Sequence, residues 1–206
     1  MIDIALQNYL NGADPAAAIR AALDRRSVVL VGMMGVGKSS IGRRLAARLA
    51  IPFVDADSEI EKAAGMTISE FFVRHGEADF RSGEARVIAR LLENGPQVLA
   101  TGGGAVMNDA TRAAIKSRGV SIWLSAEVDV LIRRIAKRKN DRPMLQTENP
   151  AETMRHLLEL REPVYALADL TVHSREAPHD AVVGDIVMSL AAFLNVAASA
   201  GRMEGT

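Results

Sequence analysis

The sequence predicts an α/β fold in which helices cover both faces of a five-stranded parallel sheet, giving three layers, α/β/α. Short apolar runs alternate with longer segments of helical periodicity, which is the pattern of a parallel sheet buried on both faces. A glycine-rich loop directly follows the first run, and no repeat or linker divides the chain, so we expect one main domain. The predicted strands are residues 28–31, 51–54, 98–100, 121–124 and 170–172.

Composition narrows the classes of function. The 206 residues carry 25 basic and 25 acidic side chains, so no net charge is available to hold a polyanion, and we expect neither nucleic acid nor a membrane as partner. Cysteine is absent, which excludes disulfides and thiolate metal sites and fits a reducing compartment. No basic stretch leads into an apolar one at the N-terminus, and the most apolar segment, 186–200, is interrupted by Ser189 and Asn195. We therefore expect a cytoplasmic protein.

The chain ends lie outside the predicted sheet. We assign residues 1–26 to an N-terminal extension, 27–196 to the main domain and 197–206 to a tail. Asp14 followed by Pro15 is typical of a helix start. The sequence leaves open whether this extension packs on the domain or forms a loosely held arm.

The loop after the first strand reads Gly-Met-Met-Gly-Val-Gly-Lys-Ser over residues 32–39. A strand, this loop and a helix, in that order, predict a phosphate site, because the glycines let backbone N–H groups converge and the helix adds its positive end. Lys38 can bring a charge to the β- and γ-phosphates, and Ser39 can ligate Mg²⁺. The alternative is a plain glycine turn before a core helix, but such a turn does not require Lys-Ser at this place.

Two carboxylates, Asp55 and Asp57, follow the second strand. Because strand residues alternate sides, we expect both to point the same way at the carboxyl end of the sheet, where α/β folds bind ligands. Paired acids there suit a magnesium ion and a substrate hydroxyl. Alternatively, Asp57 and Ser58 cap a helix over 59–64.

Two further features lie in the middle of the chain. Thr67 and Glu70 have the spacing of a capping box, and Gly76 is expected to end that helix before a longer one that carries Arg81. A single arginine is more often a solvated surface residue. The third strand runs into three glycines, 102–104, which permit close approach of a ligand to the backbone, unless they form only a flexible turn.

A basic run follows the fourth strand. The helix that starts near Glu127 becomes strongly basic from Arg133 onward, and the polar segment 137–149 is typical of a mobile lid. A solvated charged face is the usual meaning of such a run, so both interpretations stay open. Asn149 and Pro150 then begin another helix.

Between about Val28 and His173, the sequence resembles the shikimate kinases, P-loop enzymes with the fold of nucleoside monophosphate kinases. The resemblance rests on motifs in a fixed order: the loop 32–39, Asp55-Ala56-Asp57, Phe80-Arg81, Gly102-Gly103-Gly104, Arg142-Pro143 and Arg161-Glu162-Pro163-Val164-Tyr165. It implies a P-loop kinase with a lid that transfers the γ-phosphate of ATP to the 3-hydroxyl of shikimate, in the biosynthesis of chorismate and aromatic amino acids.

The resemblance also implies residue roles. Asp57 would hold the accepting hydroxyl, and Arg81 and Arg161 would grip the carboxylate of shikimate. Arg142 would close with the lid onto the ATP phosphates, and Lys38 would act with it in catalysis. The backbone of Gly102, Gly103 and Gly104 would help to hold shikimate. Ser39 would ligate Mg²⁺, with Asp55 nearby. ATP would contact Gly35, Val36, Gly37, Lys38, Ser39, Ser40 and Arg142. Shikimate and ATP are then the partners, and we expect a monomer.

Three other interpretations remain to be compared. A related kinase, such as one for gluconate, would share the phosphate loop, but two arginines and three glycines favour a compact carboxylated diol. A GTPase switch would carry an Asn-Lys-x-Asp motif, which does not occur in the chain. An inactive shikimate-binding relative is disfavoured because Lys38, Ser39, Asp57 and Arg142 are all present. Residues 175–178 match the family only loosely, so no adenine contact is assigned.

Overall fold

The computed structural model describes residues 14–136, 149–175 and 177–196. Five parallel strands form one sheet in the order β2-β3-β1-β4-β5. The strands are β1 (Ser27–Val31), β2 (Phe53–Asp55), β3 (Val98–Ala100), β4 (Gly119–Ser125) and β5 (Leu170–His173). Strand β1 is central and all five of its residues are buried, which explains the apolar run that follows Ser27, Val28–Val31.

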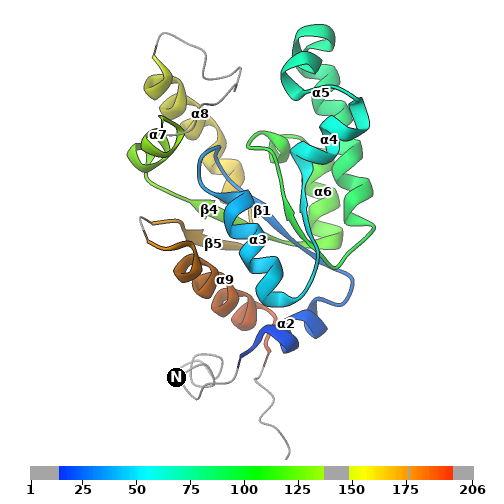
Figure 1. Ribbon diagram of the computed structural model, residues 1–206, viewed down its shortest axis with the longest axis vertical. Helices are drawn as coiled ribbons and strands as arrows, with labels where there is room; N and C mark the ends of the chain where they lie inside the picture. The colour runs from blue at the N-terminus through cyan, green and yellow to red at the C-terminus, as the bar shows by residue number, and fades with distance from the viewer. Residues whose placement is uncertain (1–13, 137–148, 176, 197–206) are drawn as a thin grey trace, which may run out of the picture.

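Helices cover both faces of the sheet (Figure 1). Leu30 faces α3, because its Cδ1 atom lies 3.1 Å from the Cβ position of Gly42, whereas Val31 faces Ile115 of α6 across a cavity. Since successive strand residues point to opposite faces, α3 and α6 lie on opposite sides of β1. The helices are α2 (Ala16–Leu23), α3 (Lys38–Leu49), α4 (Ala56–Ala64), α5 (Ile68–Leu92), α6 (Asp109–Arg118), α7 (Val128–Ala136), α8 (Pro150–Tyr165) and α9 (His179–Phe193), with a 3₁₀ turn η1 (Ala105–Met107).

The described part of the N-terminal extension packs on the domain. Helix α2 contacts α3 and α9, and both Ile19 and Leu23 are fully buried. Arg48 of α3 forms an ion pair with Asp14 at 3.1 Å. Residues 14–26 of the extension therefore pack on the domain and do not form a loosely held arm. Residues 1–13 lie outside the described part of the chain.

Local capping signals are confirmed. Thr67 and Glu70 form a complete capping box at the start of α5, and Asn149 accepts a hydrogen bond from the backbone of Glu152 at the start of α8. Gly76 has φ 80° and ψ 174°, which interrupts α5 as predicted, although two helical pieces continue on either side.

The prediction for Asp55 and Asp57 is wrong in one respect. The second strand is Phe53–Asp55, and α4 begins at Ala56, so Asp57 lies in the first turn of a helix and not on the strand. The Asp55 carboxylate accepts a hydrogen bond from the Asp57 N–H at 3.2 Å. This cap turns the chain from strand to helix one residue after Asp55, because a short acidic side chain satisfies an otherwise unpaired helical N–H. The capping residue is therefore Asp55, and neither Asp57 nor Ser58.

The described residues include no helix that is long and apolar enough to cross a membrane. Most of the predicted lid, residues 137–148, and the tail 197–206 lie outside the described part of the chain.

Candidate active site

The phosphate loop connects β1 to α3 and is shaped by three glycines. Gly32, Gly35 and Gly37 have φ of 132°, 82° and 103°, which side chains rarely adopt. A Cβ atom on Gly32 would also lie 2.5 Å from the backbone oxygen of Leu124 in β4. Gly37 is the N-cap of α3, so the positive end of that helix opens into the loop.

Lys38 is the first residue of α3 and is only 9% exposed. Its ammonium donates to the backbone oxygens of Gly32 at 2.7 Å and Met33 at 3.0 Å. The side chain is thus folded back along the loop, and its charge lies against the backbone oxygens at the start of that loop.

Ser39 and Asp55 bring two oxygens together beside the loop. The Ser39 hydroxyl donates to Oδ2 of Asp55 at 2.6 Å. A hydroxyl and a carboxylate are oxygen ligands that fit Mg²⁺, which keeps several waters and shares phosphate oxygens. Within the described ranges, no three His, Cys, Asp or Glu residues gather at a metal-binding distance. This pair therefore fits an ion carried on a nucleotide better than an ion held by protein alone.

A cavity of about 240 Å³ adjoins the phosphate loop. Its walls come from α4, α5, α8 and the loop after β3. The structure brings together residues that the sequence places far apart. Those predicted to bind substrate, Asp57, Arg81, Gly102, Gly103, Gly104 and Arg161, all line this cavity.

Arg81 is not a solvated surface residue. Its side chain is 21% exposed, and it donates to Glu84 at 2.7 Å and to Glu77 at 3.2 Å. It also lies over the ring of Phe80, 5.2 Å from the centroid. Burial works to lower the pKa of the Arg81 guanidinium, but the hydrogen bonds that it donates to Glu84 and Glu77, together with their negative charges, outweigh burial and raise this pKa. Arg81 is thus a fixed cation at the cavity wall.

Glu84 is a site residue that the sequence analysis missed. It is 1% exposed, and its Oε1 atom has no hydrogen-bond partner among the described residues. Burial raises the pKa of the Glu84 carboxyl, Arg81 opposes that increase, and Asp57 adds to it. A signal existed: Glu84 falls on the same face of α5 as Phe80 and Ile88, four residues on either side, and a carboxylate on a core face needs a partner.

The three glycines after β3 are required by close contacts and not by backbone conformation, since none of them has a left-handed φ. A Cβ atom on Gly104 would lie 2.6 Å from Nη2 of Arg81, and one on Gly102 would lie 2.9 Å from Oδ1 of Asp57. At Gly103 it would lie 3.3 Å from the backbone nitrogen of Met34 in the phosphate loop. The flexible-turn interpretation therefore fails: the segment is a closely packed part of the cavity lining, next to Met34 of the phosphate loop, which lines the same cavity.

The end of α8 supports that glycine segment. Arg161 is 6% exposed, and its Nη1 atom lies 3.6 Å from the Cβ position of Gly103. One turn later, the Tyr165 hydroxyl donates to the backbone oxygen of Gly103. Burial raises the pKa of Tyr165 to about 12, so this hydroxyl stays protonated and keeps donating at neutral pH.

Arg134 connects the basic helix α7 to the phosphate loop. It donates to the backbone oxygen of Val36 at 3.2 Å, to the Ser174 hydroxyl at 3.0 Å and to the backbone oxygen of Arg175 at 3.0 Å. At least this arginine of the basic run is therefore not a solvated charge. Arg142 lies outside the described residues.

Comparison with known proteins identifies the family. The family model for shikimate kinase matches residues 34–191. The chain belongs to the shikimate kinase family.

Relatives at high identity agree with this assignment. The shikimate kinase of Bradyrhizobium diazoefficiens is 63% identical over 182 residues, which cover 88% of this chain and 87% of that protein. The shikimate kinase of Brucella suis is 50% identical over 185 residues, which cover 89% and 92%.

Solved structures confirm the P-loop kinase fold. The shikimate kinase of Acinetobacter baumannii, solved in complex with shikimate, superposes with a TM-score of 0.79 at 36% identity and covers 85% of this chain and 97% of that chain. A gluconokinase from Sinorhizobium meliloti reaches a TM-score of 0.55 at 20% identity over 84% of this chain and 94% of that one, which shows a common fold alone. The family and fold predicted from sequence are thus confirmed.

Proposed function

We propose that this shikimate kinase family member transfers the γ-phosphate of ATP to the 3-hydroxyl of shikimate and forms shikimate 3-phosphate, a step toward chorismate and the aromatic amino acids. The observation that carries this proposal is the cavity beside the phosphate loop, where Asp57, Arg81 and Arg161 meet. Two guanidinium groups suit a carboxylate, because planar forks bind it through paired hydrogen bonds. The Asp57 carboxylate in the same cavity suits an accepting hydroxyl. The small size of the cavity, about 240 Å³, favours a compact ring.

ATP is the proposed donor, bound at the phosphate loop, whose Met34 also lines the substrate cavity. Phosphoryl transfer needs positioning and neutralisation of charge more than covalent chemistry. The backbone of Gly35, Val36 and Gly37 would cradle the phosphates, with Ser39 and Ser40 at the helix start. Lys38 would neutralise the β- and γ-phosphates. Asp57 would orient the attacking hydroxyl and accept its proton.

Mg²⁺ is the proposed cofactor, held by Ser39 with Asp55 nearby, through water. When bound, it would help to neutralise the negative charge of the phosphates during transfer. The role of Arg142 rests on the family resemblance: we assign it to a lid over 137–149 that brings a second cation to the ATP phosphates and excludes water.

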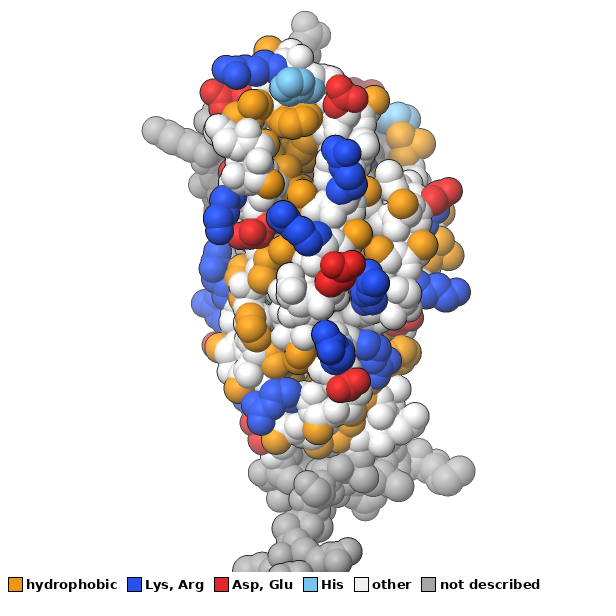
Figure 2. Space-filling model, turned by 90° about the vertical axis from the view of Figure 1, so that its right-hand side faces the viewer, with side chains coloured by type: hydrophobic (Ala, Val, Ile, Leu, Met, Phe, Trp, Pro, Cys, Tyr) orange, Lys and Arg blue, Asp and Glu red, His pale blue; other side chains and the backbone are white. Residues whose placement is uncertain are grey.

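We further propose a cytoplasmic monomer, with a main domain over 27–196, that acts on small molecules. Balanced charge and the absence of cysteine support this assignment. Figure 2 shows basic and acidic side chains interspersed on one face of the molecule.

An ADP-release assay with shikimate, gluconate or no acceptor tests the activity. We expect ADP release to require shikimate. Equal turnover with gluconate, or release that ignores the acceptor, would overturn the proposal.

A further inference from the structure

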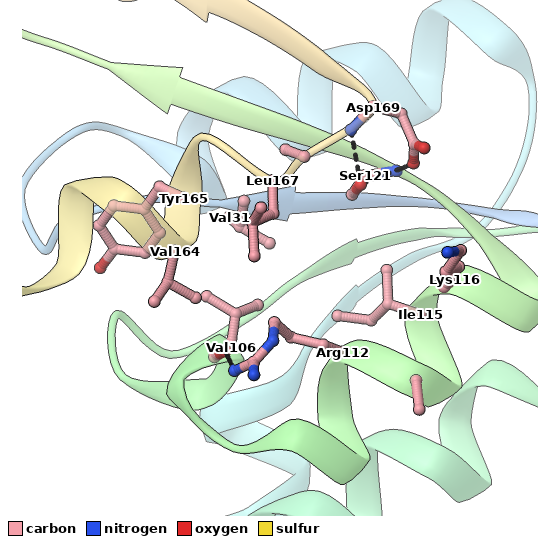
Figure 3. Close-up of a pocket in the computed structure, with 12 residues that line it drawn as sticks. Val31, Val106, Arg112, Ile115, Lys116, Ser121, Val164, Tyr165, Leu167 and Asp169 are labelled. Atoms are coloured by element: carbon pink, nitrogen blue, oxygen red, sulfur yellow. Dashed lines mark hydrogen bonds between the residues drawn. The ribbon is translucent and has the colours of Figure 1, made fainter.

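A second cavity, of about 420 Å³, lies between α6, β4 and the end of α8 (Figure 3). It shares no lining residue with the cavity that holds Asp57 and Arg81. Its volume falls in the range of about 300–1,000 Å³ that is usual for small-molecule sites. Nothing in the proposed kinase reaction uses it.

One end of this cavity is apolar. Figure 3 shows Tyr165, Val164 and Val106 gathered there, with Val31 of the central strand beside them. Leu167 adds an apolar side chain that is 70% exposed. These side chains could take a large apolar side chain out of water at little cost. Their one polar atom, the Tyr165 hydroxyl, is already hydrogen-bonded to the backbone oxygen of Gly103.

The other end carries one charge of each sign, on Asp169 and Lys116 (Figure 3). The Asp169 carboxylate is fixed: its Oδ2 accepts from the Ser121 N–H at 2.8 Å and the Ser121 hydroxyl at 2.6 Å. Its Oδ1 makes no hydrogen bond to any residue that the structure describes. Lys116 likewise forms no hydrogen bond or ion pair within the described ranges. The two charges therefore face the cavity without neutralising each other.

The Arg112 guanidinium lies beside Val106 (Figure 3), where its hydrogen bonds are made within the protein. Its Nη1 donates to the backbone oxygens of Val106 at 2.7 Å and Met107 at 3.0 Å, and its Nη2 bonds to Asp109. The charge left for a ligand is thus one carboxylate and one ammonium.

From this arrangement we propose that the cavity binds an α-amino acid with a large apolar side chain, in its zwitterionic form. The carboxylate of the ligand pairs with Lys116, its ammonium pairs with Asp169, and its side chain packs against Val106, Val164 and Tyr165. A simple anion would meet Asp169 unpaired, and a simple cation would meet Lys116 unpaired, so neither matches the cavity as well. This inference goes beyond the kinase activity and does not depend on it.

Binding of L-phenylalanine to the full-length protein tests the proposal without turnover. Trp123 is the single tryptophan of the chain and stacks on Tyr165 at a centroid distance of 6.0 Å, so a ligand against Tyr165 should change its fluorescence. We expect saturable one-to-one binding by calorimetry together with that fluorescence change. Phenylpropionate, which lacks the ammonium, and phenylethylamine, which lacks the carboxylate, should each bind at least about tenfold more weakly.

A variant locates the site. Lys116→Ala should weaken L-phenylalanine about tenfold and leave phenylethylamine unchanged, because only the carboxylate pairs with Lys116. Lys62→Ala, which removes an exposed lysine of α4 outside the cavity, is the matched control and should bind as wild type does. The proposal is overturned if all three probes bind equally well, or if Lys116→Ala binds L-phenylalanine as tightly as wild type does. It is also overturned if binding of L-phenylalanine does not saturate at a ligand concentration of about 10 mM, ten times a millimolar Kd.

Discussion

Arg81 donates to the buried carboxylate of Glu84 over 2.7 Å, so one of the two guanidinium groups of the substrate cavity is fixed before any ligand arrives. The cost of ordering a long side chain is met during folding and not during binding. This pair makes the geometry of the cavity depend on a residue that does not itself carry the proposed chemistry.

We expect Glu84→Gln to raise the KM for shikimate about tenfold, since a neutral amide holds the guanidinium less firmly. The KM for ATP should stay as in wild type. Glu77→Gln, at the exposed partner of the same arginine, is the control and should change the shikimate KM by less than about threefold. Steady-state kinetics of the two variants measure the difference, and equal effects would mean that Glu84 has no special positioning role.

Stability should depend on pH through the same carboxyl. Burial raises the pKa of Glu84 above its ordinary 4.5, so the folded protein binds the Glu84 proton more tightly than the unfolded chain does. The stability gained from this proton is present at low pH and is lost as the pH rises from 4.5 through the raised pKa. The unfolding free energy of wild type, relative to Glu84→Gln, should therefore fall over that window. Urea titrations at a series of pH values measure it, and a difference that stays constant would contradict the assignment.

The two acids after β2 should separate by function. Asp57→Asn should lower kcat by about 10²–10⁴ and leave the KM for ATP nearly unchanged, because it removes the group that we propose to orient the hydroxyl and take its proton. Asp55→Asn should instead raise the Mg²⁺ concentration needed for half-maximal rate, and excess Mg²⁺ should restore part of the activity. Rescue of Asp57→Asn by Mg²⁺ would place Asp57 in the metal site.

Gly104→Ala should impair shikimate use without unfolding the protein. The added methyl group would lie 2.6 Å from the end of the Arg81 side chain, which can move, so the damage falls on the position of the guanidinium. We expect the shikimate KM to rise about tenfold and the melting temperature to stay near wild type. Gly184→Ala in α9, where the Cβ position has no neighbour within 4 Å, is the control and should leave kinetics unchanged. A normal KM in Gly104→Ala would show that Arg81 does not bind shikimate from its described position.

Arg142→Ala tests the lid. A cation that arrives on closure stabilises the transition state more than the bound substrates, so kcat should fall by about 10³ with little change in either KM. Arg138→Ala removes a charge from the same basic run and should retain its kcat. If both variants lose activity equally, the run acts by its total charge and not through Arg142.

Most of the fold can be predicted from local sequence signals, whereas the candidate site can be predicted from them only in part. The caps at Thr67 and Asn149 are predicted because both partners lie within a few residues. The alternation of strand residues places Asp57 on β2, whereas in the structure Asp55 caps α4 and ends the strand. The helix cap therefore overrides the strand periodicity. Glu84 is harder to predict because, although Arg81 lies only three residues away on the same helix, its other neighbours, Gly102, Asp57 and Arg161, come from distant parts of the chain.

The central position of β1 has a consequence for how the enzyme opens. Its backbone amides are hydrogen-bonded between β3 and β4 under helices on both faces, so they should exchange with deuterium only through global unfolding. The segment of α5 before Gly76 is joined to the rest by a helix interruption and carries Val73 at 88% exposure, so it should exchange through local opening. The part of α5 before Gly76, which lines the proposed substrate cavity, should then open locally while strand β1, which leads into the phosphate loop, stays folded.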